Sequence, residues 1–170
     1  MISAVIYNSK TGSCKKYAQM ISAKLAVPCY PMGCSHVRAG GQVAYVSWVM
    51  AGKVVGYETA AKVYDVVAVA AVGMAPASAG SASRGREANK VPENVGFFSL
   101  QGGFNIHKLP LPLRLIMKVK TKDIAKQLRL KKDKAPLTAQ EEAMYNMARR
   151  GVGEPAEWNV DEIVAWLKAN

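Results

Sequence analysis

Residues 6–18 read IYNSKTGSCKKYA, a short apolar run followed by a hydroxyl-rich turn and then by a helix-like segment. A turn from a strand into a helix directs backbone N–H groups and the positive end of the helix dipole at its ligand, so an anion fits best there. Ser9, Thr11 and Ser13 add hydroxyl donors, and Gly12 lets the backbone approach closely. The turn lacks the G-x-x-x-x-G-K-[ST] spacing of a nucleoside triphosphate loop and the G-x-G-x-x-G spacing of a dinucleotide loop. It therefore predicts a site for a monophosphate; the alternative is an ordinary turn whose hydroxyls cap the helix.

Apolar segments elsewhere predict five strands, at residues 2–7, 27–31, 42–49, 65–73 and 94–100. Residues 43–46 and 66–72 are continuously apolar, which is typical of parallel strands covered on both faces. Parallel strands need crossovers, and helices are predicted at residues 14–25, 57–64, 81–89 and 113–130. Residues 33–41 are expected to form a loop in place of a helix between the second and third strands.

Two helix starts are predicted near the end of the sequence. Thr138-x-x-Glu141 and Asn159-x-x-Glu162 each match a capping residue with a carboxylate three positions later. The first of these helices is expected to close at Arg149-Arg150-Gly151, and the second, which contains Trp166, to pack on the sheet. Together these segments predict a single α/β domain over residues 1–170, a doubly wound five-stranded parallel sheet with helices on both faces.

The composition bounds the class of protein. No apolar stretch reaches the roughly 18–20 residues that span a bilayer, and the first residues do not resemble a secretory leader, so a cytoplasmic protein is expected. The three cysteines show no C-x-x-C pair and the two histidines no ligand spacing, so neither a disulfide framework nor a metal site is expected. The 23 Lys and Arg against 12 Asp and Glu give a net charge of +11, which favours acidic partners.

The hydroxyl-rich turn, with the segments after the later strands, resembles the flavodoxin family. Residues 7–13 and 16–18 are similar to its phosphate loop, and similar segments occur at 48–53, 73–78 and 101–104, after the third, fourth and fifth predicted strands. With the basic segment 108–120 and the helix start at Thr138, the likeness extends to a branch of small bacterial flavodoxin-like proteins that includes the menaquinone-dependent protoporphyrinogen oxidases. It covers nearly the whole chain.

The resemblance implies a flavin mononucleotide (FMN) cofactor and an oxidoreductase that passes electrons from a donor substrate to a quinone or protein acceptor, with a protoporphyrinogen oxidase-like reaction as one option. No catalytic side chain is expected, because the flavin supplies the chemistry. The turn at 9–14 would hold the phosphate, and the turns at 47–52 and 73–78 would flank the isoalloxazine ring, with Trp48 as the aromatic candidate for stacking. The predicted cofactor contacts are Ser9, Lys10, Thr11, Gly12, Ser13, Cys14, Ser47, Trp48, Val49, Met50, Ala51, Gly52, Gly73, Met74, Ala75, Pro76 and Ser78.

The basic segment 114–134 contains nine Lys or Arg, with Leu113, Met117, Ile124 and Leu128 at helical spacing. One interpretation is a solvated helix packed on the domain by this apolar stripe; the other is an amphipathic surface that meets anionic lipid, peripheral to the inner face of the membrane, where quinone is available. Nucleic acid is not an expected partner, because aromatic residues are not interleaved with the basic ones.

Two alternatives to the oxidoreductase stay open at this point. The first is a non-enzymatic electron-transfer protein whose basic face docks an acidic redox partner. The second is a degenerate loop that binds no flavin, because Cys14 stands where another hydroxyl is common and the 33–41 connection is short. The sequence does not specify an oligomeric state.

Overall fold

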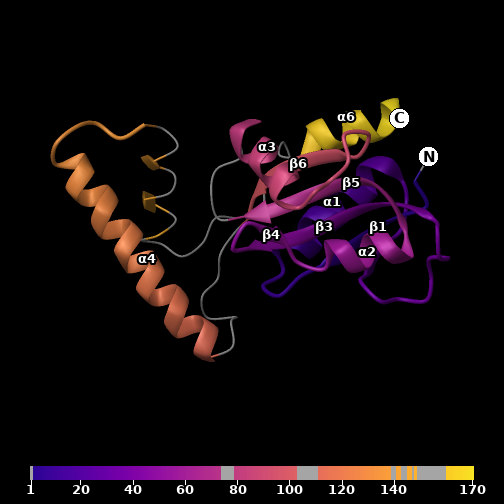
Figure 1. Ribbon diagram of the computed structural model, residues 1–170, viewed down its shortest axis with the longest axis horizontal. Coiled ribbons are helices and arrows are strands. Elements are labelled where there is room, and N and C mark those ends of the chain that lie inside the picture. The colour runs from indigo at the N-terminus through magenta and orange to yellow at the C-terminus, as the bar shows by residue number, and fades with distance from the viewer. Residues whose placement is uncertain are drawn as a thin grey trace.

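A parallel sheet forms the centre of the computed structural model (Figure 1). The model describes residues 2–73, 79–102, 111–138, 141–142, 145–146, 148 and 160–170. The five parallel strands are β1 (Ala4–Asn8), β2 (Cys29–Pro31), β3 (Gln42–Met50), β5 (Asp65–Gly73) and β6 (Gly96–Gln101). Their order across the sheet is β2-β1-β3-β5-β6, which is the order of flavodoxin-like sheets. The order reverses between β1 and β3, and in doubly wound sheets ligands bind beyond the carboxyl ends of the strands at such a point.

Helices cover both faces of the sheet. On one face, α1 (Ser13–Leu25) and α6 (Asp161–Ala169) bury Tyr17, Ile21 and Ile163 against the strands. On the other face, α2 (Tyr57–Val63) and α3 (Ala79–Ala88) pack near a second cluster of buried residues. Neighbouring strand residues alternate between the two, since Val5 belongs to the first cluster and Ile6 to the second. The predicted α/β class, with a doubly wound parallel sheet and helices on both faces, is confirmed.

One strand was not predicted. Strand β4 (Lys53–Val54) pairs antiparallel with the end of β3, through a turn at Ala51 and Gly52. Both turn residues have positive φ, 50° and 81°, which suits a two-residue hairpin. Residues 47–49 belong to β3, in agreement with the strand predicted at 42–49, and the turn predicted at 47–52 is confined to Ala51 and Gly52.

Helix α4 (Leu111–Lys132) lies well apart from the sheet (Figure 1). The chain continues into a short helical segment at 141–142, 145–146 and 148, which lies beside α4 in Figure 1. The predicted capping box of this segment is confirmed, because the Thr138 N–H donates to Glu141 Oε2 (3.0 Å) and the Glu141 N–H donates to Thr138 Oγ1 (3.3 Å).

The last predicted helix packs on the sheet as expected. Val160 takes the N-cap position of α6, and Trp166 meets Phe98 edge to face with 6.2 Å between ring centres. The predicted cap Asn159 and the predicted helix end at 149–151 lie outside the described residues. No helix within the described ranges is both long and apolar enough to cross a bilayer.

Candidate functional site

The turn after β1 forms the start of the candidate site. Gly12 is the N-cap residue of α1 and has a left-handed backbone with φ 99°, which a residue with a Cβ adopts only with strain. The Gly12 N–H donates to Ser9 Oγ (3.1 Å), so Ser9 closes the turn and does not cap the helix. The cap residue itself carries no side chain, and the first N–H groups of a helix have no partner within the helix. The turn thus presents donors of the kind that hold a phosphate.

The remaining turn residues differ in what they present. Lys10 is exposed and Thr11 half-buried, whereas Ser13 is only 8% exposed. Cys14 is 3% exposed, and its thiol belongs to the core cluster under α1. Burial raises the pKa of the Cys14 thiol to about 12, and a hydrogen bond with Ser9 opposes this shift only in part. The Cys14 thiol is therefore not available to a ligand.

The ends of β5 and β6 meet this turn. The Gly102 N–H donates to the Gly73 carbonyl oxygen (2.8 Å). A Cβ added at Gly102 would lie 2.6 Å from Val72 Cγ1 and 3.7 Å from Ser13 Cβ, so only glycine fits between these strands and α1. Gly73 thus lies at the predicted edge, whereas the contacts predicted at Met74, Ala75, Pro76 and Ser78 lie outside the described residues.

Trp48 connects the end of β3 to the turn after β1. The Lys10 ammonium group lies 4.9 Å from the centre of the Trp48 ring, within cation–π range. The half-buried Trp48 packs against the core, and its indole Nε1 is buried without an acceptor among the described residues. Through Lys10, the structure therefore brings the predicted phosphate turn into contact with the predicted aromatic residue.

The other cofactor contacts predicted at the end of β3 belong to the hairpin that β3 forms with β4. Ser47 is fully buried, and its hydroxyl donates to the Val55 carbonyl oxygen (2.6 Å), which also accepts from the Tyr45 hydroxyl (2.8 Å). Val49 is half-buried and pairs with Val54. Met50, Ala51 and Gly52 are exposed at the tip of the hairpin. The Ser47 hydroxyl is therefore already engaged by the backbone of the hairpin.

A buried asparagine holds the hairpin and was not singled out from the sequence. Asn89 is 9% exposed, and its Oδ1 accepts from the Val54 N–H (2.8 Å). Its Nδ2 donates to the carbonyl oxygens of Gly52 (3.0 Å) and Gly85 (2.8 Å). Gly102 was also absent from the predicted contacts, although its place directly after the fifth strand was a usable signal.

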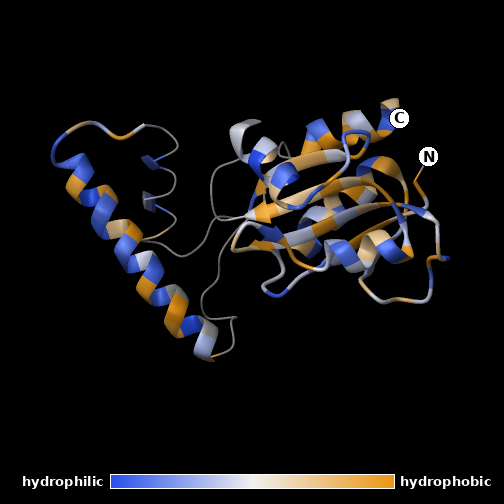
Figure 2. Ribbon diagram, viewed as in Figure 1, coloured by the Kyte–Doolittle hydropathy of each residue, from blue (hydrophilic) through white to orange (hydrophobic). Residues whose placement is uncertain are grey.

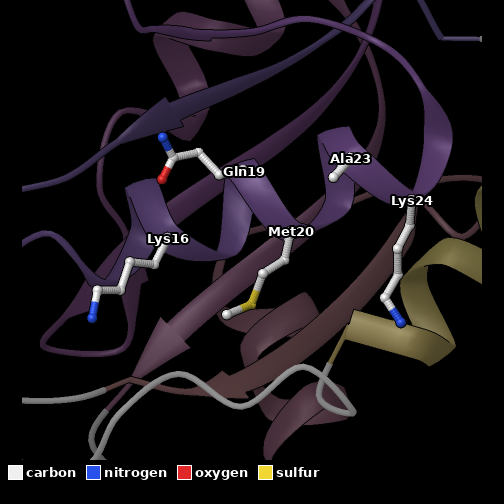
Figure 3. Close-up of a pocket in the computed structure, with 5 residues that line it drawn as sticks. All are labelled: Lys16, Gln19, Met20, Ala23 and Lys24. Carbon is white, nitrogen blue, oxygen red and sulfur yellow. The ribbon is translucent and has the colours of Figure 1, made fainter.

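A pocket on α1 does not coincide with this site (Figure 3). Its lining residues in the described part of the chain are Lys16, Gln19, Met20, Ala23 and Lys24. Lys24 is already paired with Asp161 of α6 at 2.6 Å. None of the predicted contact residues lines this pocket, so it does not contribute to the candidate site.

The described residues hold no cluster of three or more His, Cys, Asp or Glu that suits a metal ion. In comparisons with known proteins, no family model, no curated protein and no solved structure matches the chain.

Proposed function

We propose that the chain is a flavodoxin-like FMN protein that acts as an oxidoreductase, taking electrons from a donor substrate and passing them to a quinone or protein acceptor. The observation that carries the proposal is the Lys10–Trp48 contact beside the turn at Gly12, at the point where the strand order reverses. A phosphate turn, a cation and an aromatic ring at such a point are what a mononucleotide with a flat ring system requires. A cytoplasmic place of action is part of the proposal.

Each part of the site has a role in this function. The turn at 9–13 and the start of α1 would hold the phosphate through backbone N–H groups and the Thr11 hydroxyl. Trp48 would stack on the isoalloxazine ring or border it. The bound flavin would supply the redox chemistry, and the chain would position it and set the field around it.

The positive charge of the protein would make the reduction potential of the bound flavin less negative. Lys10 lies beside the site, and the whole chain carries +11. A positive field stabilises an anionic reduced flavin, so the bound FMN would have a less negative reduction potential than in an acidic flavodoxin. The same field suits a donor substrate with carboxylate groups, such as a porphyrinogen.

The test is FMN binding to two matched variants, followed by visible absorbance and identification of the released cofactor by mass. Thr11→Glu adds a carboxylate beside the proposed phosphate, and charge repulsion should weaken FMN binding at least tenfold, given about 4 kcal/mol at 4 Å near a protein surface. Thr59→Glu adds the same charge on an exposed position of α2 and should leave binding unchanged. Folded protein that takes up no FMN, or equal weakening by both variants, would refute the cofactor assignment.

Turnover separates the enzyme from a simple electron carrier. The FMN-loaded protein is mixed with reduced donor candidates and a quinone, and in a second experiment with acidic redox proteins alone. Turnover in the first mixture supports the oxidoreductase. Electron exchange only with the acidic proteins supports docking of a redox partner on the basic surface instead.

A further inference from the structure

The outward side of α4 carries a row of exposed aliphatic side chains. Leu111, Leu115 and Val119 are 69%, 64% and 68% exposed. They follow one another at intervals of four residues, so they form one line along the helix. Ile116 and Leu130 are also exposed, and of the seven large hydrophobic residues found exposed in the described part of the chain, five lie in α4.

The opposite side of α4 is already covered. Thr121 is 4% exposed and Ile124 and Leu128, two residues of the predicted apolar stripe, are half-buried. The helical segment that starts at Glu141 contacts the C-terminal end of α4, where Glu141 pairs with Lys131 and Glu142 lies 3.6 Å from Lys132. Val119 and Thr121 are two residues apart, about 200° around the helix, so the exposed row lies away from the buried side that Thr121 marks.

Lysine side chains lie on the same side of α4 as the exposed aliphatic row. Lys118, Lys122 and Lys126 recur every four residues, all are exposed, and they lie on the same side as Leu115 and Val119. The whole helix carries eight Lys or Arg against one Asp. Figure 2 shows hydrophobic and hydrophilic residues interleaved along the length of α4. More than half of the net charge of +11 is therefore carried by this one helix.

We propose that α4 is a membrane-surface element that binds anionic lipid bilayers in the plane of the interface. The row Leu111, Leu115 and Val119 would enter the boundary between headgroups and acyl chains, while Lys118, Lys122 and Lys126 contact headgroup phosphates. Neither set suffices alone: the apolar row is short, and surface charge attraction by itself is screened by salt. Bilayer binding uses no group of the flavin site and does not rest on the proposed cofactor.

An anionic bilayer fits α4 better than a nucleic acid does. Phosphate contacts need only cations, and they leave exposed leucines in water. Single-stranded nucleic acids also stack their bases on aromatic rings, and α4 contains no aromatic residue. A bilayer with an apolar interior and an anionic surface accommodates both the aliphatic row and the cations.

The experiment is co-sedimentation of the full chain with vesicles of phosphatidylglycerol and phosphatidylcholine, and with vesicles of phosphatidylcholine alone. Lys118→Glu/Lys122→Glu/Lys126→Glu should weaken binding to the anionic vesicles about 100-fold, because each surface cation contributes about a factor of 5. Lys15→Glu/Lys62→Glu/Lys90→Glu makes the same charge change at exposed positions outside α4 and should weaken binding by less than 10-fold. Circular dichroism checks that both proteins fold.

A second pair of variants tests the apolar row. Leu115→Ser/Val119→Ser should weaken binding about tenfold or more at unchanged net charge, whereas Val63→Ser on α2, which is 40% exposed, should not. No sedimentation with anionic vesicles, or equal losses in each test variant and its control, would overturn the proposal. A different outcome would assign the surface to nucleic acid: only the triple glutamate variant loses vesicle binding, and both the wild type and Leu115→Ser/Val119→Ser bind a DNA oligonucleotide. Thr11→Glu should sediment like the wild type, so failure of the flavin assignment leaves this result unaffected.

Discussion

The backbone of Cys14 lies in the first turn of α1, beside the candidate phosphate site, whereas its thiol lies in the core. Because burial raises the thiol pKa from 9.0 to about 12, the fraction of reactive thiolate is about 1000-fold lower than in the unfolded chain. We predict that iodoacetamide at pH 8 modifies the half-buried Cys29 and Cys34 while Cys14 stays unmodified until the protein unfolds, as read by peptide mass spectrometry. Labelling of native Cys14 as fast as Cys29 would contradict this.

The same pKa shift predicts how stability changes with pH. The unfolded chain loses the Cys14 proton near pH 9, whereas the folded chain holds it to about pH 12. The unfolded state therefore binds fewer protons over this window, and the free energy of unfolding should fall as pH rises through it. Cys14→Ala should remove this contribution to the alkaline slope in urea titrations at pH 8, 9 and 10. An unchanged slope would show that the thiol does not contribute.

The elements that local patterns define were predictable, and those that depend on distant partners were not. Apolar runs located five strands within two residues at each end, and the capping box at Thr138 and Glu141 is formed as predicted. Strand β4 was missed because it has two residues and is held by Asn89, 35 positions later. The apolar stripe of α4 was predicted, but periodicity cannot tell whether such a stripe covers the sheet or a neighbouring helix.

The hairpin of β3 and β4 gives a prediction at this scale. Asn89→Ala removes three hydrogen bonds and leaves the Val54 N–H without its acceptor, so the free energy of unfolding should fall by about 2–3 kcal/mol in urea titrations. Asn94→Ala changes an exposed asparagine in the turn before β6 and should stay within about 0.5 kcal/mol of the wild type. Equal stability of the two variants would mean that the hairpin does not depend on Asn89.

Across the whole molecule, the candidate flavin site and the proposed lipid surface belong to separate parts of the chain. The site lies at the end of the sheet near Gly12 and Trp48, and the surface lies on α4, which stands apart from the sheet (Figure 1). The concentration of positive charge in residues 114–134 was readable from the sequence, but the separation of this segment from the candidate site needed the three-dimensional arrangement. The arrangement predicts that the two binding events are energetically independent, since well-separated sites without shared partners add within about 0.3–0.5 kcal/mol.

A double-mutant cycle tests this independence. Thr11→Glu, the triple glutamate variant at Lys118, Lys122 and Lys126, and their combination are each measured for FMN binding and for vesicle binding. If the two sites are independent, each change lowers only its own affinity, and the combined protein shows both losses with a coupling of no more than about a factor of 2. A larger coupling, in which vesicles tighten FMN binding and FMN tightens vesicle binding by the same factor, would mean that α4 docks near the site when lipid is bound. Reciprocity then serves as the internal check, because a change seen in only one of the two affinities cannot be a coupling between binding sites.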